Sequence, residues 1–154
     1  MISIKRILFP TDFSEFAKPA QDYASALAEQ YHAELHVLYV LQDIALVMPE
    51  PGMMMSMPAL NLDEVQESAE RALASIIDPQ WPQEKVVRAT RRGAPYVEIV
   101  RYAADKQIDL IVMGTHGRSG LPHVLLGSVA EKVVRKAPCP VLTVRPTGHE
   151  FVMP

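Results

Sequence analysis

The stretch at residues 108–134, IDLIVMGTHGRSGLPHVLLGSVAEKVV, holds three patterns in succession. Its first part, Ile108 to Met113, is apolar enough for a buried strand. Glycines then recur through residues 114–127, which predicts a loop. Valines follow at helical spacing, so we expect a helix to begin near Ser128. A strand, a loop and a helix in this order are typical of one unit of an α/β fold.

The same alternation of strand and helix patterns extends along the rest of the chain. Four more strands are expected at Ile4–Phe9, Leu35–Leu41, Lys85–Arg91 and Val141–Val144. The other helices are expected to begin near Lys18, after the candidate cap Asn61, and at Pro95. The faces expected to point inward are Ala20, Tyr23, Ala24, Leu27, Ala28 and Tyr31 in the first helix and Tyr96, Ile99, Val100 and Ala103 in the third. One domain over residues 1–154 accommodates the whole pattern.

These patterns predict an open five-stranded parallel sheet with helices on both faces, a Rossmann-like α/β fold. The strand order 3-2-1-4-5 places the more polar strand, Lys85–Arg91, at an edge. Ligands bind such sheets outside the carboxyl ends of the strands, where the winding reverses. Here that point lies between the first and fourth strands, beside Pro10-Thr11-Asp12 and Gly114–Arg118.

The glycine loop has the residue types that suit phosphate binding. Sharp turns at Gly114 and Gly117 would aim N–H groups inward, without a Cβ to hold a phosphate away. A helix beginning at Gly127-Ser128 would offer further N–H groups and a positive dipole end to an anion, and Arg118 would balance its charge. The alternative is that the glycines only shape a connection and Ser128 only caps the helix. The position at the expected switch point favours binding.

Three motifs together resemble the universal stress protein family. Gly114-x2-Gly117-x9-Gly127-Ser128 is similar to the family's nucleotide-binding signature, G-x2-G-x9-G-[S/T]. Residues 7–14, ILFPTDFS, are similar to the family's first strand and loop, and residues 137–144, APCPVLTV, to its last strand. The resemblance covers essentially the whole chain. It implies an adenine nucleotide alpha hydrolase-like fold and, in the subclass with this signature, binding of ATP or a related adenine nucleotide, with or without Mg.

The resemblance also implies which residues contact the nucleotide. Asp12 and the backbone at Val40 would face the adenosine, and Met113 would line the base pocket. The phosphates would be held at the start of the last helix by N–H groups and a hydroxyl. The full implied set is Pro10, Thr11, Asp12, Val40, Met113, Gly114, His116, Gly117, Arg118, Gly127, Ser128 and Val129. Phe13 departs from the family pattern, which often has glycine there, and is expected to narrow the mouth of the site.

Composition restricts the classes of function that the chain could have. The chain has 154 residues, 49% apolar and 21% charged, which suits one domain with a sizeable core. A net charge of −3 and the lack of a basic stripe argue against nucleic-acid binding. The sequence shows no membrane helix and no signal peptide pattern, so the cytoplasm is the expected location. The single cysteine, Cys139, is interpreted as a packing residue.

The leading hypothesis for function is a nucleotide-binding sensor or switch in a stress response rather than an enzyme. Efficient phosphoryl transfer needs metal-binding carboxylates and a group that orients water. Asp12 is the only carboxylate close to the expected site, and the G-x4-G-K-[ST] loop is absent. Slow ATP hydrolysis, with His116 as the candidate group, and an interaction protein with a vestigial pocket are the alternatives. No metal site is expected, because His116 and His123 lack a third ligand.

A homodimer is expected to form through the fifth strand. The segment Val141–Val144 is short and apolar, and the predicted order places it at a sheet edge. An edge strand presents unpaired N–H and C=O groups, which invite pairing with a second copy of the same strand. The family resemblance implies the same surface. Arg145 and Pro146 would stop the pairing from extending further.

Overall fold

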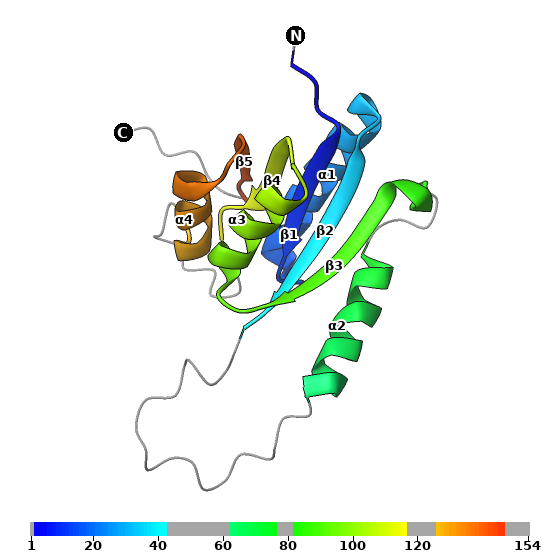
Figure 1. Cartoon of the computed structure of the whole chain (residues 1–154), viewed down its shortest axis with the longest axis vertical. Coiled ribbons are helices and arrows are strands. Elements are labelled where there is room, and N and C mark those ends of the chain that lie inside the picture. The colour runs from blue at the N-terminus through cyan, green and yellow to red at the C-terminus, as the bar shows by residue number, and fades with distance from the viewer. Residues whose placement is uncertain (1, 43–61, 77–81, 117–125, 147–154) are drawn as a thin grey trace, which may run out of the picture.

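A computed structural model describes residues 2–42, 62–76, 82–116 and 126–146 of the chain. Its five strands are all parallel and form one sheet in the order β3-β2-β1-β4-β5 (Figure 1), which confirms the order expected from the sequence. The strands are β1 (Arg6–Thr11), β2 (Glu34–Leu41), β3 (Val86–Arg92), β4 (Leu110–Gly114) and β5 (Val141–Val144). The more polar strand β3 and the short strand β5 lie at the two edges.

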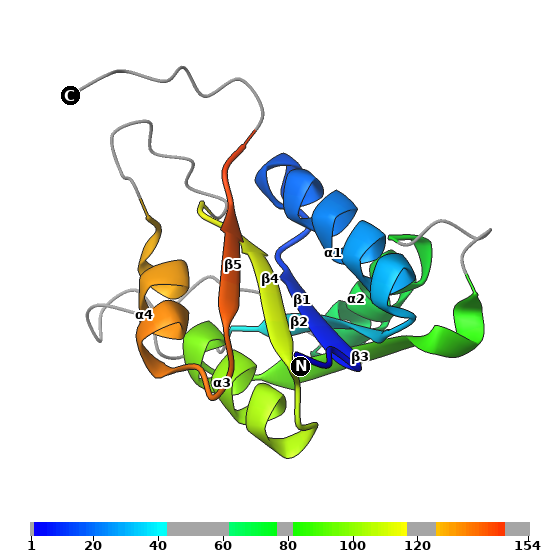
Figure 2. The same cartoon turned by 90° about the horizontal axis from the view of Figure 1, so that it is seen from above.

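Helices cover both faces of the sheet. On one face lie α1 (Lys18–Tyr31) and α2 (Leu62–Ser75), and on the other lie α3 (Pro95–Asp105) and α4 (Ser128–Lys136), as Figure 2 shows. Two short 3-10 helices, η1 (Glu15–Ala17) and η3 (Gln83–Lys85), precede α1 and β3. None of the helices in the described ranges is long and apolar enough to cross a bilayer.

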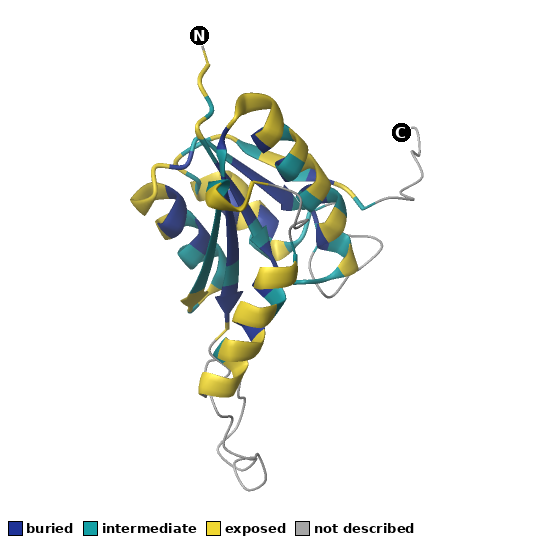
Figure 3. Ribbon diagram, turned by 90° about the vertical axis from the view of Figure 1, so that its right-hand side faces the viewer, coloured by how far each residue is buried: buried dark blue, intermediate teal, exposed yellow. Residues whose placement is uncertain are grey.

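Each face of the central strands contributes to a separate apolar cluster. In β1, Ile7 and Phe9 pack with the cluster under α1 and α2, while Leu8 between them packs with the cluster under α3 and α4. All three side chains are fully buried. Figure 3 shows buried residues along the strands and exposed ones on the outer sides of the helices. Burial on both faces explains why the strands read as apolar runs without alternation.

The helix α1 begins at Lys18, as expected, because η1 occupies the residues before it. Pro19 falls in the first turn, where its missing N–H breaks no helical bond. Its buried face is made of Ala20, Ala24 and Ala28. Tyr23 and Tyr31 were placed on that face by periodicity, but they are 56% and 45% exposed, so this part of the expectation is wrong. Three alanines let the helix lie close to the sheet, which leaves the larger side chains outside.

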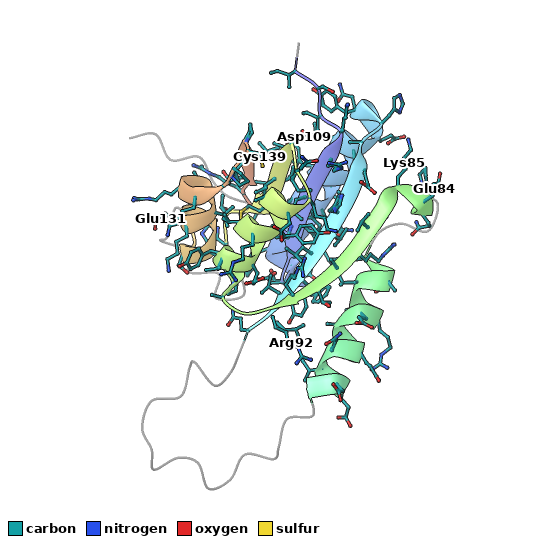
Figure 4. The ribbon with its side chains drawn as sticks, viewed as in Figure 1. Glu84, Lys85, Arg92, Asp109, Glu131 and Cys139 are labelled. Atoms are coloured by element: carbon teal, nitrogen blue, oxygen red, sulfur yellow. The ribbon has the colours of Figure 1, made fainter. Side chains whose placement is uncertain are left out.

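Asp109 forms hydrogen bonds with the backbone at the amino end of β1. Its Oδ2 accepts hydrogen bonds from the N–H groups of Lys5 at 2.7 Å and Arg6 at 2.9 Å. Figure 4 shows Cys139 at the same end as Asp109, far from the carboxyl ends of the strands. Burial raises the pKa of the half-buried Cys139 thiol, and the Asp109 carboxylate adds to the effect. A thiol that stays protonated is a poor nucleophile, which agrees with a packing role.

A buried polar network joins β2 to α3. His36 is 3% exposed and Tyr102 is 2% exposed. The Tyr102 hydroxyl lies 2.9 Å from Nδ1 of His36, and Oε2 of Glu34 lies 3.2 Å from Nε2. These contacts suit a neutral imidazole, in which Nδ1 accepts from the hydroxyl and Nε2–H donates to the carboxylate. Periodicity alone does not reveal this network, since Tyr102 was not assigned to the inner face of its helix.

Stability is expected to fall as the pH drops below 6.5. Burial lowers the pKa of His36 from its ordinary value of 6.5, against the opposing effect of the Glu34 carboxylate. The unfolded chain therefore takes up a proton at a pH where the folded protein does not, and this favours unfolding. The contribution of His36 is complete above 6.5 and is lost as the pH falls from there through the lower folded pKa.

Urea unfolding at about pH 7.5 and about pH 5.5 measures this effect, because the interval spans the usual histidine range. The His36→Gln variant is the control, since a glutamine amide can form hydrogen bonds but does not titrate. It should lose less stability between the two pH values than the wild type. An equal loss in both proteins would show that His36 is not the group responsible.

Candidate functional site

Strand β1 pairs differently with its two neighbours. With β2 the ladder runs the whole length of β1, whereas with β4, among the described residues, it is formed only by Ile7 and Leu8 of β1. The ladder between β1 and β4 therefore ends well before Thr11 and Gly114, the last residues of the two strands. The winding of the sheet reverses between these strands, so this is where a parallel α/β sheet receives a ligand.

Local hydrogen bonds shape the segment that follows β1. Oγ1 of Thr11, which is 7% exposed, accepts a bond from the N–H of Phe13 at 3.0 Å. Oδ1 of Asp12 accepts bonds from the N–H of Ser14 at 3.0 Å and from its hydroxyl at 2.6 Å. Side chains that bond to the backbone two residues on are a standard way to fix a turn. Asp12 therefore shapes the turn, and the turn holds its carboxylate at the carboxyl end of β1.

Gly114, the first glycine of the signature, is required by packing. A Cβ at this position would lie 3.0 Å from the carbonyl oxygen of Phe16 and 3.8 Å from Cα of Ala17. Among the described glycines only Gly93 has a positive φ, so Gly114 makes no turn that is closed to other residues. The expectation of a sharp turn at Gly114 is therefore wrong. The missing side chain instead lets η1 approach the end of β4.

Thr115 closes the base of the loop that follows β4. Its N–H donates to the carbonyl of Val144 at 2.9 Å, and its own carbonyl accepts the N–H of Gly127 at 2.7 Å. These bonds hold the start of α4 beside the ends of β4 and β5. They also occupy the N–H of Gly127, which the sequence assigned to phosphate. Ser128 and Val129, rather than Gly127, carry first-turn N–H groups that the helix itself cannot use.

The first turn of α4 presents the positive end of a helix dipole at this position. Gly127 is the N-cap with extended backbone angles, and its carbonyl accepts the N–H of Glu131 at 2.9 Å. Ser128 is exposed. Glu131 would oppose a bound anion if it faced the site, but its carboxylate pairs with Arg135 at 3.1 Å, and Figure 4 shows it on the outer side of α4. The arrangement therefore suits an anionic group.

His116 is oriented by its neighbour. Its Nδ1 lies 2.9 Å from Oγ1 of Thr115, whose side chain is 4% exposed. His116 itself is partly buried, which does not fit a side chain that simply points into solvent. Gly117 and Arg118, two further residues of the implied site, lie outside the described residues.

The remaining implied contacts gather on the α3 and α4 side of the sheet. Val40, at 9% exposure, and Met113, at 6%, belong to the same apolar cluster. Their strands end on either side of β1, whose half-buried Pro10 precedes Thr11 and Asp12. The described part of the chain therefore brings the ends of β1, β2 and β4 and the start of α4 to one end of the sheet.

Residues 3–145 match the family model for the universal stress protein family. The chain belongs to this family. Universal stress protein MJ0531 from Methanocaldococcus jannaschii is 37% identical over 147 residues, which are 95% of this chain and 85% of that relative. Universal stress protein MJ0577 from the same organism is 30% identical over 94% of this chain and 96% of its own length.

Solved structures of universal stress proteins share the fold. The structure of MJ0577 matches with a TM-score of 0.79 at 30% identity, covering 96% of this chain and all of that one. A universal stress protein in complex with cAMP matches with a TM-score of 0.60 at 25% identity, covering 94% of this chain and 99% of that one. In each comparison the likeness extends over nearly the whole length of this chain and of the matched chain.

Two residues that sequence reasoning did not single out as contacts shape the structure around the candidate site. Thr115 is hidden inside the G-x2-G spacing, and its bonds to Val144 and Gly127 depend on strands and helices distant in sequence. For Phe13, the sequence indicated only a departure from the family pattern that narrows the mouth of the site. Its ring lies against Tyr39, with the centroids 4.6 Å apart, on the side of α1 and α2. Neither role could be derived from spacing, because both depend on contacts across the fold.

Proposed function

We propose that this universal stress protein binds an adenine nucleotide, ATP or a related one, at the carboxyl ends of β1 and β4 and acts as a stress-response sensor or switch. The observation that carries the proposal is the bond between Thr115 and Gly127, which holds the N-terminus of α4 at the switch point. The cAMP complex of a similar universal stress protein supports an adenine nucleotide as the class of ligand.

The proposed contacts combine the chemistry of the described residues with the family signature. Asp12 and the backbone of Val40 face the adenosine, and Met113 lines the base. The N–H groups of Ser128 and Val129, with the Ser128 hydroxyl, bind the phosphates. Gly117 and Arg118 flank the phosphates, as the signature implies. Mg, when present, accompanies the phosphates.

Binding without efficient turnover fits the groups near the site. N–H donors at a helix start stabilise a phosphate group in the ground state and in the transition state alike, which gives affinity without rate. Rapid hydrolysis would also need a group acting on water, and in the described part of the chain His116 is the candidate. Slow ATP hydrolysis is therefore the second candidate function, supported by the fixed position of His116 beside Thr115. A vestigial pocket is the third candidate.

Ser128→Pro is expected to weaken ATP binding by about tenfold or more, since hydrogen bonds to charged groups contribute roughly 1.5–3 kcal/mol. Proline removes both the N–H and the hydroxyl of this residue. It suits the first helical position, and the ψ of 155° at Gly127 is compatible with a following proline, so α4 should form normally. Isothermal titration calorimetry with ATP measures the affinity, and thermal melting without ligand checks the fold.

Ser128→Ala is the matched control, because it removes the hydroxyl and keeps the N–H group. Its loss of affinity should be clearly smaller than that of Ser128→Pro. If the folded Ser128→Pro protein bound ATP as tightly as the wild type, the phosphates would not lie at the start of α4. A wild type that binds no adenine nucleotide would contradict the proposed function as a whole.

We propose that the protein forms a homodimer through the open edge of β5. The carbonyl of Pro140 accepts the N–H of Ile111 in β4 at 3.0 Å, and the carbonyl of Val144 accepts the N–H of Thr115, just after β4, at 2.9 Å. Because backbone groups alternate along a strand, Val141 and Thr143 direct theirs to the outer edge. Val144 is 9% exposed and packs inside, whereas Leu142 is 37% exposed beside the edge.

Thr143→Pro is expected to convert the dimer to a monomer. Proline deletes an N–H on the outer edge and breaks no bond to β4, and proline is tolerated in edge strands for this reason. Thr143→Val keeps the N–H group and should remain dimeric. Analytical ultracentrifugation at micromolar concentration measures the state of each protein. A monomeric wild type, or a dimeric Thr143→Pro protein, would exclude this interface.

A further inference from the structure

Phe13 adopts a backbone conformation that aromatic residues rarely take. Among the described residues, three that are not glycine have a positive φ: Phe13 at 62°, His32 at 53° and Gln107 at 51°. His32 and Gln107 follow the ends of α1 and α3, where left-handed backbone is ordinary. Phe13 follows no helix and comes directly after Asp12. A bulky residue in this region is an outlier, and it persists only where the surroundings hold it in place.

Both the backbone and the ring of Phe13 are held. Its N–H donates to Oγ1 of Thr11 at 3.0 Å. Its ring packs on Tyr39 with the centroids 4.6 Å apart and an interplanar angle of 38°. Tyr39 pairs with Thr11 in the ladder between β1 and β2. Thr11 and Tyr39, the two residues that hold Phe13, are thus neighbours in the sheet. The contact of the Phe13 ring with Tyr39 forms a bridge between the segment after β1 and strand β2.

This bridge connects two of the proposed adenosine contacts. The left-handed turn at Phe13 brings the N–H of Ser14 back to Oδ1 of Asp12, 3.0 Å away. On the other side of the bridge, Tyr39 immediately precedes Val40. A ring fixed on Tyr39 therefore sets the position of the Asp12 carboxylate relative to the backbone of Val40.

We propose that Phe13 is a positioning residue that holds Asp12 and Val40 in the arrangement that receives adenosine, an inference that rests on the proposed function above. A glycine at this position would adopt the same backbone more easily, but it would lack the ring that fixes the loop to β2. Preorganisation of this kind raises affinity by removing the cost of ordering the loop on binding. The residue acts on the adenosine side of the site and leaves the phosphate side at α4 unchanged.

The test uses Phe13→Gly and two probes, adenosine and inorganic tripolyphosphate, with affinities measured by calorimetry. Phe13→Gly should weaken adenosine binding about tenfold, while tripolyphosphate binding stays within about twofold of the wild type. Phe13→Tyr keeps an aromatic ring at this position, so it should bind adenosine as tightly as the wild type. Tyr31→Ala removes an aromatic side chain that is 45% exposed on α1, and it should change neither affinity. Ser128→Pro should show the opposite pattern, with weak tripolyphosphate binding and normal adenosine binding.

A merely structural role predicts a different result, in which Phe13→Gly lowers the melting temperature and weakens both probes equally. That outcome would overturn the inference and leave the proposed function intact. Adenosine binding that is unchanged or tighter in Phe13→Gly would overturn the inference as well, since the Phe13 ring would then not contribute to affinity. A wild type that binds neither adenosine nor ATP would overturn both the inference and the proposed function.

Discussion

Tyr102→Ala is expected to lower the free energy of unfolding by about 3–5 kcal/mol, the range for deleting a large aromatic side chain from a core. Tyr102 is 2% exposed and lies in the apolar cluster under α3 and α4. Its removal would leave a cavity between α3 and the sheet. It would also deprive Nδ1 of His36 of the hydroxyl 2.9 Å away. Guanidinium unfolding, with the midpoint and slope compared between variant and wild type, measures the loss.

Tyr102→Phe separates the two causes, because it keeps the ring and removes only the hydroxyl. It should cost about 1–3 kcal/mol, the penalty for leaving a buried polar group without its partner. Tyr23→Ala is the control for loss of a tyrosine as such, since Tyr23 is 56% exposed on α1 and its removal should change stability by less than about 0.5 kcal/mol. A Tyr102→Ala protein no less stable than Tyr23→Ala would mean that the network between β2 and α3 does not stabilise the fold.

The architecture could be predicted from the sequence because each strand and helix carries its own local signal. The central strands are apolar on both faces, so they read as continuous apolar runs. Pro95 and Ser128 mark helix starts at the residues where the helices begin. The more polar composition of β3 was enough to place it at an edge of the sheet. Strand order then follows from topology rules that need no knowledge of individual contacts.

Contacts between elements could not be predicted in the same way. Helical periodicity places Tyr23 on the inner face of α1 and does not place Tyr102 on the inner face of α3. The structure exposes Tyr23 and buries Tyr102. The difference arises because three alanines bring α1 close to the sheet. Between α3 and the sheet there is room for Tyr102, whose hydroxyl forms a hydrogen bond with His36. Both facts depend on the distance between a helix and the sheet, which no single segment encodes.

For the candidate site too, the location could be predicted from the sequence, but the individual contacts could not. Its location followed from the switch point, and the structure brings Asp12, Val40, Met113 and Ser128 to that end of the sheet. The roles of individual atoms did not follow. The N–H of Gly127 donates to the carbonyl of Thr115. Spacing cannot show this bond, because its two residues are distant in the sequence and meet only in the folded chain.

Gly114→Val is expected to destabilise the fold by about 3 kcal/mol or more, at or beyond the upper end of the usual cost of overpacking. The added Cβ would lie 3.0 Å from the carbonyl oxygen of Phe16. That oxygen belongs to the backbone of η1 and cannot rotate away as a flexible side chain could. Either η1, which follows the turn at Asp12, or the end of β4, which carries Met113, must shift. Thermal and guanidinium unfolding of the variant without ligand measure the effect.

Gly127→Ser is the matched control at the other described glycine of the signature. Gly127 has φ −65° and ψ 155°, which any residue can adopt, and serine is a good N-cap, so this variant should be at least as stable as the wild type. If Gly114→Val were as stable as Gly127→Ser, the close approach of η1 would not require glycine. If Gly114→Val is unstable as expected, its failure to bind ATP would say nothing about phosphate contacts. The presence of glycine at the first signature position would then reflect the packing of η1 against β4, and Ser128 would be the position that reports on the nucleotide.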